Sequence, residues 1–243
     1  MNNLQIKNDL PLSISWEWIK SSFAIFREKP INFTWFAILY LILSTLPFMG
    51  AFFGMVALVR ILISANYIEN NEPFGMGLNI GHILRQRNIL SFAIFNVGFD
   101  LIIMSIMSQV MTSWGLKSDA DIAQIASNPH IVYLFAGISL FRILFFGISP
   151  AIITFNPDIT VFKALSISWK FMLRYIANLV FAVFMLLPFL LIPLYLALIG
   201  ILTVKNSIVF GLLFFILIII ILLIINILTI FSFKIYKDGF YRG

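Results

Sequence analysis

The chain contains no cysteine. This excludes disulfides, thiolate metal sites and cysteine nucleophiles, and it leaves the redox compartment open. Charged residues are also scarce: they make up 11% of the 243 residues, whereas about a quarter is usual in soluble domains. With 61% hydrophobic residues and a mean hydropathy of +1.04, no aqueous fold could bury so much apolar surface. The composition therefore predicts an all-α, polytopic membrane protein.

Patterns typical of catalytic and metal sites are missing as well. There is no H-E-x-x-H, no G-x-S-x-G and no pair of aspartates within one apolar segment. The two histidines, His82 and His130, fall on opposite sides of the membrane in the topology argued below. Asp119 and Asp121 are explained more simply as first-turn acids of a helix capped by Ser118 than as metal ligands. We expect no enzymatic activity, no metal and no cofactor.

Long apolar segments predict about six transmembrane helices within a single domain, residues 1–243. A crossing needs about 20 mostly apolar residues. Residues 12–29 predict a basic amphipathic helix, which either lies at the headgroup boundary or packs against the bundle. Similar short helices are expected at 74–86 and 159–174. The expected spans are residues 31–48, 50–68, 89–111, 131–155, 176–204 and 206–233.

Lysine and arginine are distributed unequally between the two sides of this topology. Six spans place both termini on one side, which carries twelve Lys and Arg residues, while the other side carries only Lys117 and Lys205. Cytoplasmic loops are enriched in these residues, so both termini are expected in the cytoplasm. The net charge of +6 is then explained by anionic lipid headgroups, and no nucleic-acid partner is expected.

Three charged residues fall near the middle of predicted spans: Arg60, Asp100 and Arg142. A carboxylate at the bilayer centre costs about 2.5–3.5 kcal/mol on insertion scales, so Asp100 should face protein and have a partner. In one interpretation it pairs with one arginine, while the other snorkels or binds backbone carbonyls. In the other, surplus positive charge lines a cavity for an anion or lipid phosphate, or Asp100 relays protons. Asn96 and, if its helix is displaced, Asn226 are candidate supporting residues.

Two features concern helix packing and shape. Gly50 and Gly54 open the second span, and small residues at this spacing let helix backbones approach closely. Pro188 and Pro193 lie within the fifth span. Proline inside a membrane helix frees carbonyl groups and usually kinks the helix, so a kink is expected there.

A short internal repetition accompanies these features. Residues 12–16 recur at 165–169, and residues 92–95 resemble 181–184. Each stretch belongs to a unit made of an interfacial helix and two spans, and the chain divides into three such units. Since all three begin on the same side, the repeat would be parallel. Low-complexity apolar sequence also produces such matches by chance.

The opening of the chain, with Trp16, Trp18 and Ile19 before Pro30, resembles a family of uncharacterised bacterial inner-membrane proteins. The residues from Ser149 to Ala151, followed by those from Phe162 to Ser168, are similar to the second signature of that family. The resemblance implies about six helices and a location in the bacterial inner membrane. It brings no established activity and no functional residues.

Two functions remain open on this basis. The first is a non-enzymatic inner-membrane protein, either an accessory subunit or a lipid-associated scaffold, whose partners are membrane lipids and other membrane-protein subunits. The second is a small transporter or channel for an anionic solute, a lipid or protons that uses the cluster of Arg60, Asp100 and Arg142. A water-accessible cavity at Asp100 would favour transport, and a dry, packed ion pair would favour the scaffold.

Overall fold

A computed structural model describes residues 4–46, 50–77, 79–114, 129–203 and 207–242 of the chain. A π-helical turn, η1 (Leu187–Leu191), joins α10 to α11, and two short strands, β1 (Leu4–Ile6) and β2 (Phe240–Arg242), pair antiparallel. The predicted all-helical class is confirmed except for this small sheet. The helices are α1 (Ile14–Glu28), α2 (Pro30–Ser44), α3 (Gly50–Glu69), α4 (Ile80–Leu84), α5 (Arg87–Ser113), α7 (Pro129–Phe146), α8 (Ser149–Phe155), α9 (Val161–Arg174), α10 (Ile176–Leu186), α11 (Ile192–Thr203) and α12 (Ser207–Gly239).

Four helical segments in the described ranges are long and apolar enough to cross a membrane: α3, α5, α7 continued into α8, and α12. A fifth is added if α9 and α10 count as one span bent by 77°. The predicted first span corresponds to α2, which has 15 residues and is shorter than the roughly 20 residues of a straight crossing. The described helices are thus compatible with a helical membrane bundle of four to five crossings, and the count of six spans stays a prediction.

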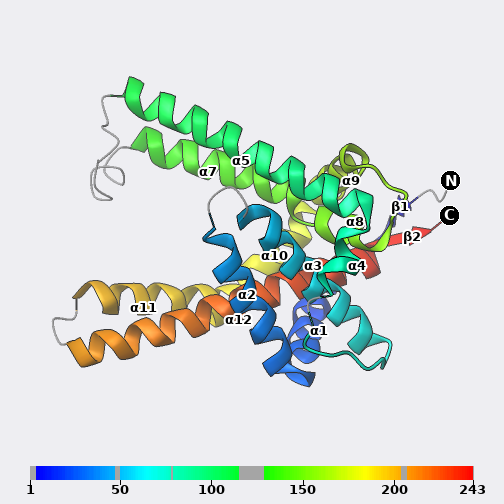
Figure 1. The fold of residues 1–243 in the computed structure, drawn as a ribbon, viewed down its shortest axis with the longest axis horizontal. Coiled ribbons are helices and arrows are strands. Elements are labelled where there is room, and N and C mark those ends of the chain that lie inside the picture. Colours follow the sequence, from blue (N-terminus) through cyan, green and yellow to red (C-terminus); the bar gives the residue numbers. More distant parts are fainter. Residues whose placement is uncertain (1–3, 47–49, 78, 115–128, 204–206, 243) are drawn as a thin grey trace.

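The long helices form hairpins, which Figure 1 shows in one view. α5 lies beside α7, α11 beside α12, and α2 beside α3. The α5–α7 and α11–α12 hairpins extend in the same general direction and separate toward their tips, with α2 and α3 between them (Figure 1). Helices α8 and α9 and both chain ends lie at the opposite end of the molecule.

The main hydrophobic core lies where α1, α3, α5, α8, α9 and α12 meet. Trp18 of α1 is fully buried and contacts Phe231 of α12 edge-on, with ring centroids 6.1 Å apart. Trp16, on another side of α1, is 43% exposed. Residues three and four positions apart share a helix face, and Trp18 with Ser22 and Ile25 forms the face against the bundle.

The chain ends are tied together by backbone and side-chain bonds. Leu4 pairs with Arg242 in the β1–β2 ladder, and the Lys7 amide donates to the Gly239 carbonyl at 2.9 Å. The Tyr175 hydroxyl donates to the Lys7 carbonyl and so connects the N-terminal segment to the end of α9. The termini therefore lie side by side (Figure 1).

The glycines predicted to allow close packing lie where α3 meets α2. A Cβ atom at Gly50 would stand 2.5 Å from the carbonyl oxygen of Ser44, and one at Gly54 would stand 3.3 Å from the Tyr40 ring. Atoms cannot approach to 2.5 Å without a shift of the backbone. The small residues therefore permit the close approach of these two helices.

The proline-containing segment departs from α-helical geometry at one point. Pro188 lies in the π-helical turn, and Pro193 follows as the second residue of α11. Proline has no N–H for the usual helical hydrogen bond, and a π turn accommodates the break. A bend of 77° lies elsewhere, between α9 and α10.

Two other predictions need correction or lie outside the described ranges. The helix predicted over 74–86 is reduced to α4, residues 80–84, because Asn79 adopts a left-handed backbone with φ 48° that cannot continue a right-handed helix. The predicted helix start at Ser118, with Asp119 and Asp121, lies outside the residues that the structure describes.

Candidate functional sites

An ion pair joins α5 to α7. The Arg142 guanidinium donates to both carboxylate oxygens of Asp100, at 2.7 and 3.4 Å, and Phe99 stacks on Phe141 beside it with centroids 5.8 Å apart. The side chains of Arg142 and Asp100 are 51% and 30% exposed. The pair therefore cross-links the hairpin while remaining open on one side.

This open side faces a groove of about 350 Å³ between the α2–α3 and α5–α7 hairpins. Asn96 also lines the groove, and its amide donates to the Phe92 carbonyl at 3.3 Å. Gly50 and Gly54 line the opposite wall with Tyr40 and Ser44. Five of the residues singled out from the sequence thus line one groove, although they were predicted for different reasons: Gly50, Gly54, Asn96, Asp100 and Arg142.

Arg60 lies apart from this pair. Its side chain is buried, donates to the Gly75 carbonyl at 2.9 Å and stands over the Phe36 ring at 5.4 Å. In the described part of the chain Arg60 forms no ion pair, so the predicted cluster of three charges is not assembled. The segment after α3 supplies a carbonyl, and α2 supplies an aromatic ring, in place of a carboxylate. This corresponds to the interpretation in which Asp100 pairs with one arginine and the other binds backbone.

Asn226 is fully buried in α12 and outside the groove. Its amide nitrogen donates to the Leu222 carbonyl at 3.0 Å, one turn earlier in the same helix. Its side-chain oxygen has no hydrogen-bond partner among the described residues. The displacement of α12 that would bring Asn226 to Asp100 is not observed.

A second ionic site, which the sequence analysis missed, joins α3 to α12. Glu69 contacts Lys234 at 2.8 Å and Lys237 at 3.2 Å, and Lys234 lies 3.7 Å from Asp238. Lys234 is only 8% exposed. Their place in the sequence predicts only a role for these lysines in setting the topology. The sequence signal that predicts this pairing is one acidic residue at the end of one span and two lysines at the end of another, on the same side of the membrane.

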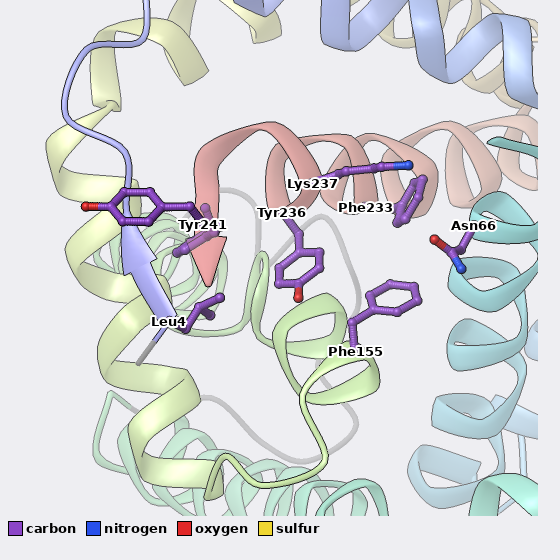
Figure 2. Close-up of a pocket in the computed structure, with 8 residues that line it drawn as sticks. Leu4, Asn66, Phe155, Phe233, Tyr236, Lys237 and Tyr241 are labelled. Carbon is purple, nitrogen blue, oxygen red and sulfur yellow. The ribbon is translucent and has the colours of Figure 1, made fainter. Parts of the chain in front are cut away.

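An aromatic pocket of about 370 Å³ lies next to this ionic site and is drawn in Figure 2. Five aromatic side chains from α8, α12 and β2 line it, together with Leu4, Asn66 and Lys237. The rings of Phe155 and Tyr236 stack with centroids 5.4 Å apart, and the Tyr236 hydroxyl accepts a hydrogen bond from Asn156 at 2.9 Å. The pocket combines a mostly aromatic wall with one cation.

A larger cleft of about 640 Å³ opens along α1. Trp16 and Phe23 of α1 contribute apolar surface, and Phe189 of the π-helical turn packs against Phe23 with centroids 6.3 Å apart. Lys20 and Arg27, both exposed, line the same cleft. The proline-induced turn therefore helps to form an apolar cleft with two cations.

Within the described ranges, no three His, Asp or Glu side chains gather in a group that could hold a metal ion. No protein-family model, curated protein sequence or solved structure matches this chain.

Proposed function

We propose that the chain is a non-enzymatic protein of the bacterial inner membrane that binds anionic lipid and acts as a scaffold or accessory subunit. The observation that carries this proposal is the cleft along α1. Its apolar surface from Trp16, Phe23 and Phe189 matches acyl chains, and Lys20 and Arg27 match a phosphate headgroup. A basic amphipathic helix with Trp and Phe on its apolar side is typical of the membrane interface.

The charge distribution agrees with this placement. Both chain ends lie at the same end of the molecule as α9, which carries Lys163, Lys170 and Arg174, and we infer that this end faces the cytoplasm (Figure 1). We infer also that α2 and the α10–α11 segment complete six crossings, in three parallel units that each begin with a short helix. Since the chain has no cysteine, single cysteines can test this topology. Trp114→Cys should react with an impermeant thiol reagent from outside intact cells, and Tyr241→Cys only after permeabilisation; the reverse result would contradict the orientation.

Lipid binding is tested in nanodiscs that contain phosphatidylcholine and phosphatidylglycerol, by native mass spectrometry of the retained lipid. Replacing Lys20 and Arg27 with glutamine should weaken phosphatidylglycerol binding about thirtyfold, because each basic residue contributes about 1 kcal/mol at an anionic surface. The matched control replaces Lys163 and Lys170 of α9, which are also exposed. Equal retention by both double variants would contradict a specific role for the cleft.

The scaffold part of the proposal requires protein partners. Purification from native membranes in a mild detergent, followed by mass spectrometry, should recover stoichiometric membrane-protein partners together with anionic lipid. Recovery of anionic lipid without a protein partner would agree with the proposed lipid site but contradict the role as an accessory subunit.

Transport is a second candidate, and the partly exposed Asp100–Arg142 pair favours it. If the groove holds water, Ser44→Cys on its wall should react with a charged methanethiosulfonate reagent. Ser22→Cys, at a buried position of α1, is the unreactive control. A reactive Ser44→Cys would favour transport, and an unreactive one would favour the scaffold.

A further inference from the structure

We propose that the aromatic pocket of Figure 2 binds a planar aromatic anion, a role that goes beyond lipid association. The pocket is separate from the cleft along α1 and shares no lining residue with it. Its volume of about 370 Å³ is near the lower end of the range of roughly 300–1,000 Å³ for small-molecule sites. A ligand of one or two fused rings with a charged group is of this size.

The walls of the pocket favour a flat apolar body. The ring centroid of Phe155 lies 5.5 Å from that of Phe233 and 5.4 Å from that of Tyr236. The ring centroids of Tyr236 and Phe240 are 5.8 Å apart. These rings come from α8, α12 and the first residue of β2, so they surround the space from different elements. Aromatic rings bind one another through offset-stacked and edge-on contacts, which a planar ligand satisfies better than a flexible chain.

The polar groups set the charge of the ligand. In Figure 2 the amine of Lys237 and the amide of Asn66 lie on one side of the pocket, opposite Leu4 and Tyr241. The hydroxyl of Tyr241 is already bonded to Gln5 at 2.7 Å. Lysine offers three donors and no acceptor. The polar end therefore favours a carboxylate or phosphate, which the Asn66 amide can also bind.

Lys237 can turn to a ligand without leaving its acidic neighbour unpaired. Its Nζ lies 3.2 Å from Glu69, but Glu69 also holds Lys234 at 2.8 Å, and the Lys237 side chain is 38% exposed. The Lys237 amine stands 5.9 Å from the Phe233 ring centre. A cation between a ring and a carboxylate is thus already positioned at the polar end of the pocket.

The paired chain ends complete the site. Leu4 reaches the pocket because β1 pairs with β2, and Phe240 and Tyr241 on β2 form the same wall. A strand pair of three residues is short for independent stability. Ligand binding should therefore stabilise the pairing of the two chain ends, and the function of this sheet is to form part of the pocket wall.

The experiment titrates 1-naphthyl phosphate into nanodiscs holding the full chain, by calorimetry, with empty nanodiscs as the blank for membrane partitioning. Three comparison ligands each lack one feature of 1-naphthyl phosphate. Cyclohexyl phosphate lacks the planar aromatic rings, 1-naphthalenemethanol lacks the charge, and inorganic phosphate lacks the whole apolar group. We expect saturable binding of 1-naphthyl phosphate and at least about tenfold weaker binding of each of the others. Heat equal to that of empty nanodiscs, or equal affinity for cyclohexyl phosphate, would overturn the proposal.

Variants locate the binding. Lys237→Gln should weaken the binding of 1-naphthyl phosphate about tenfold or more, because a bond to a charged group is lost. The affinity for 1-naphthalenemethanol, which has no charge, should not change. Lys163→Gln on α9 makes the same charge change away from the pocket and should have no effect. Asn66→Leu, which keeps the Glu69 contacts, provides a second test if Lys237→Gln unfolds. Wild-type affinity in the folded variants would place the ligand elsewhere.

Discussion

The two ionic sites use the few charges of this chain in opposite ways. The Glu69–Lys234–Lys237 site joins α3 to α12, which are distant in sequence, and the Lys234 side chain is only 10% exposed. The Asp100–Arg142 pair joins the two helices of one hairpin, and the Arg142 side chain is 51% exposed. In the first site Lys234 is enclosed by the bundle while Lys237 is 38% exposed and lines the aromatic pocket, whereas the second site faces a groove. Burial therefore separates Lys234, whose charge stabilises the fold, from Lys237 and Arg142, whose charges are available to a ligand.

The largest effect is expected from breaking the buried site. Glu69→Leu leaves Lys234 buried without its closest counter-charge, which should lower the free energy of unfolding by about 3 kcal/mol. Thermal unfolding in detergent, followed by tryptophan fluorescence, measures the change. Glu72→Leu, at an exposed position just after α3, should be nearly neutral. If both variants melt alike, the buried pair does not stabilise the fold.

The next effect concerns the wall of the groove. Gly50→Val forces a side chain against the Ser44 carbonyl and should destabilise by about 1–3 kcal/mol, because the α2–α3 contact has no room to adjust. Gly98→Ala in α5 is the matched control, since nothing lies within 4 Å of its added Cβ. The control should be neutral or slightly stabilising, as alanine favours helix over glycine. An unchanged melting temperature for Gly50→Val would mean that α2 is not packed as closely as the structure places it.

A double-mutant cycle then distinguishes a pair of charges from a cluster of three. Asp100→Leu and Arg142→Leu should couple by about 1 kcal/mol, because the residues are in contact. Asp100→Leu and Arg60→Leu should add to within about 0.5 kcal/mol, because Arg60 contacts Gly75 and Phe36 instead. Unfolding free energies of the single and double variants supply both cycles. Coupling of Asp100 to Arg60 would restore the three-charge cluster.

Much of the fold follows from hydrophobic length and charge, and the errors have identifiable causes. Runs of apolar residues identify α3 and α5 closely, against the predicted 50–68 and 89–111, whereas α12 continues to Gly239, beyond the predicted end at 233. Residue spacing cannot tell which arginine meets Asp100, because Arg60 and Arg142 have similar predicted depth and only the packing of α2 and the segment near Gly75 separates them. Strands of three residues carry almost no sequence signal, so the β1–β2 pair was not predicted.

The aromatic pocket was missed for a related reason. Leu4, Asn66 and Phe155 belong to segments that the sequence places in separate elements, and each residue is ordinary where it stands. Only the pairing of the chain ends and the Glu69 contacts bring them around Lys237. A site assembled from long-range contacts leaves no local motif to find.

The smallest expected effect is the dependence of the two ion-pair coupling energies on salt concentration. Raising the salt concentration to about 1 M shortens the Debye length to about 3 Å, which screens charges that water reaches. The coupling of Asp100 to Arg142 should then fall by about 0.5 kcal/mol if the groove is hydrated, since pairs exposed to water gain little at high salt. The coupling of Glu69 to Lys234, measured by the same cycle, should change less because Lys234 is enclosed. An equal loss of coupling free energy at both sites would mean that water reaches both. No loss of coupling at either site would indicate that the groove is dry, which favours the scaffold over transport.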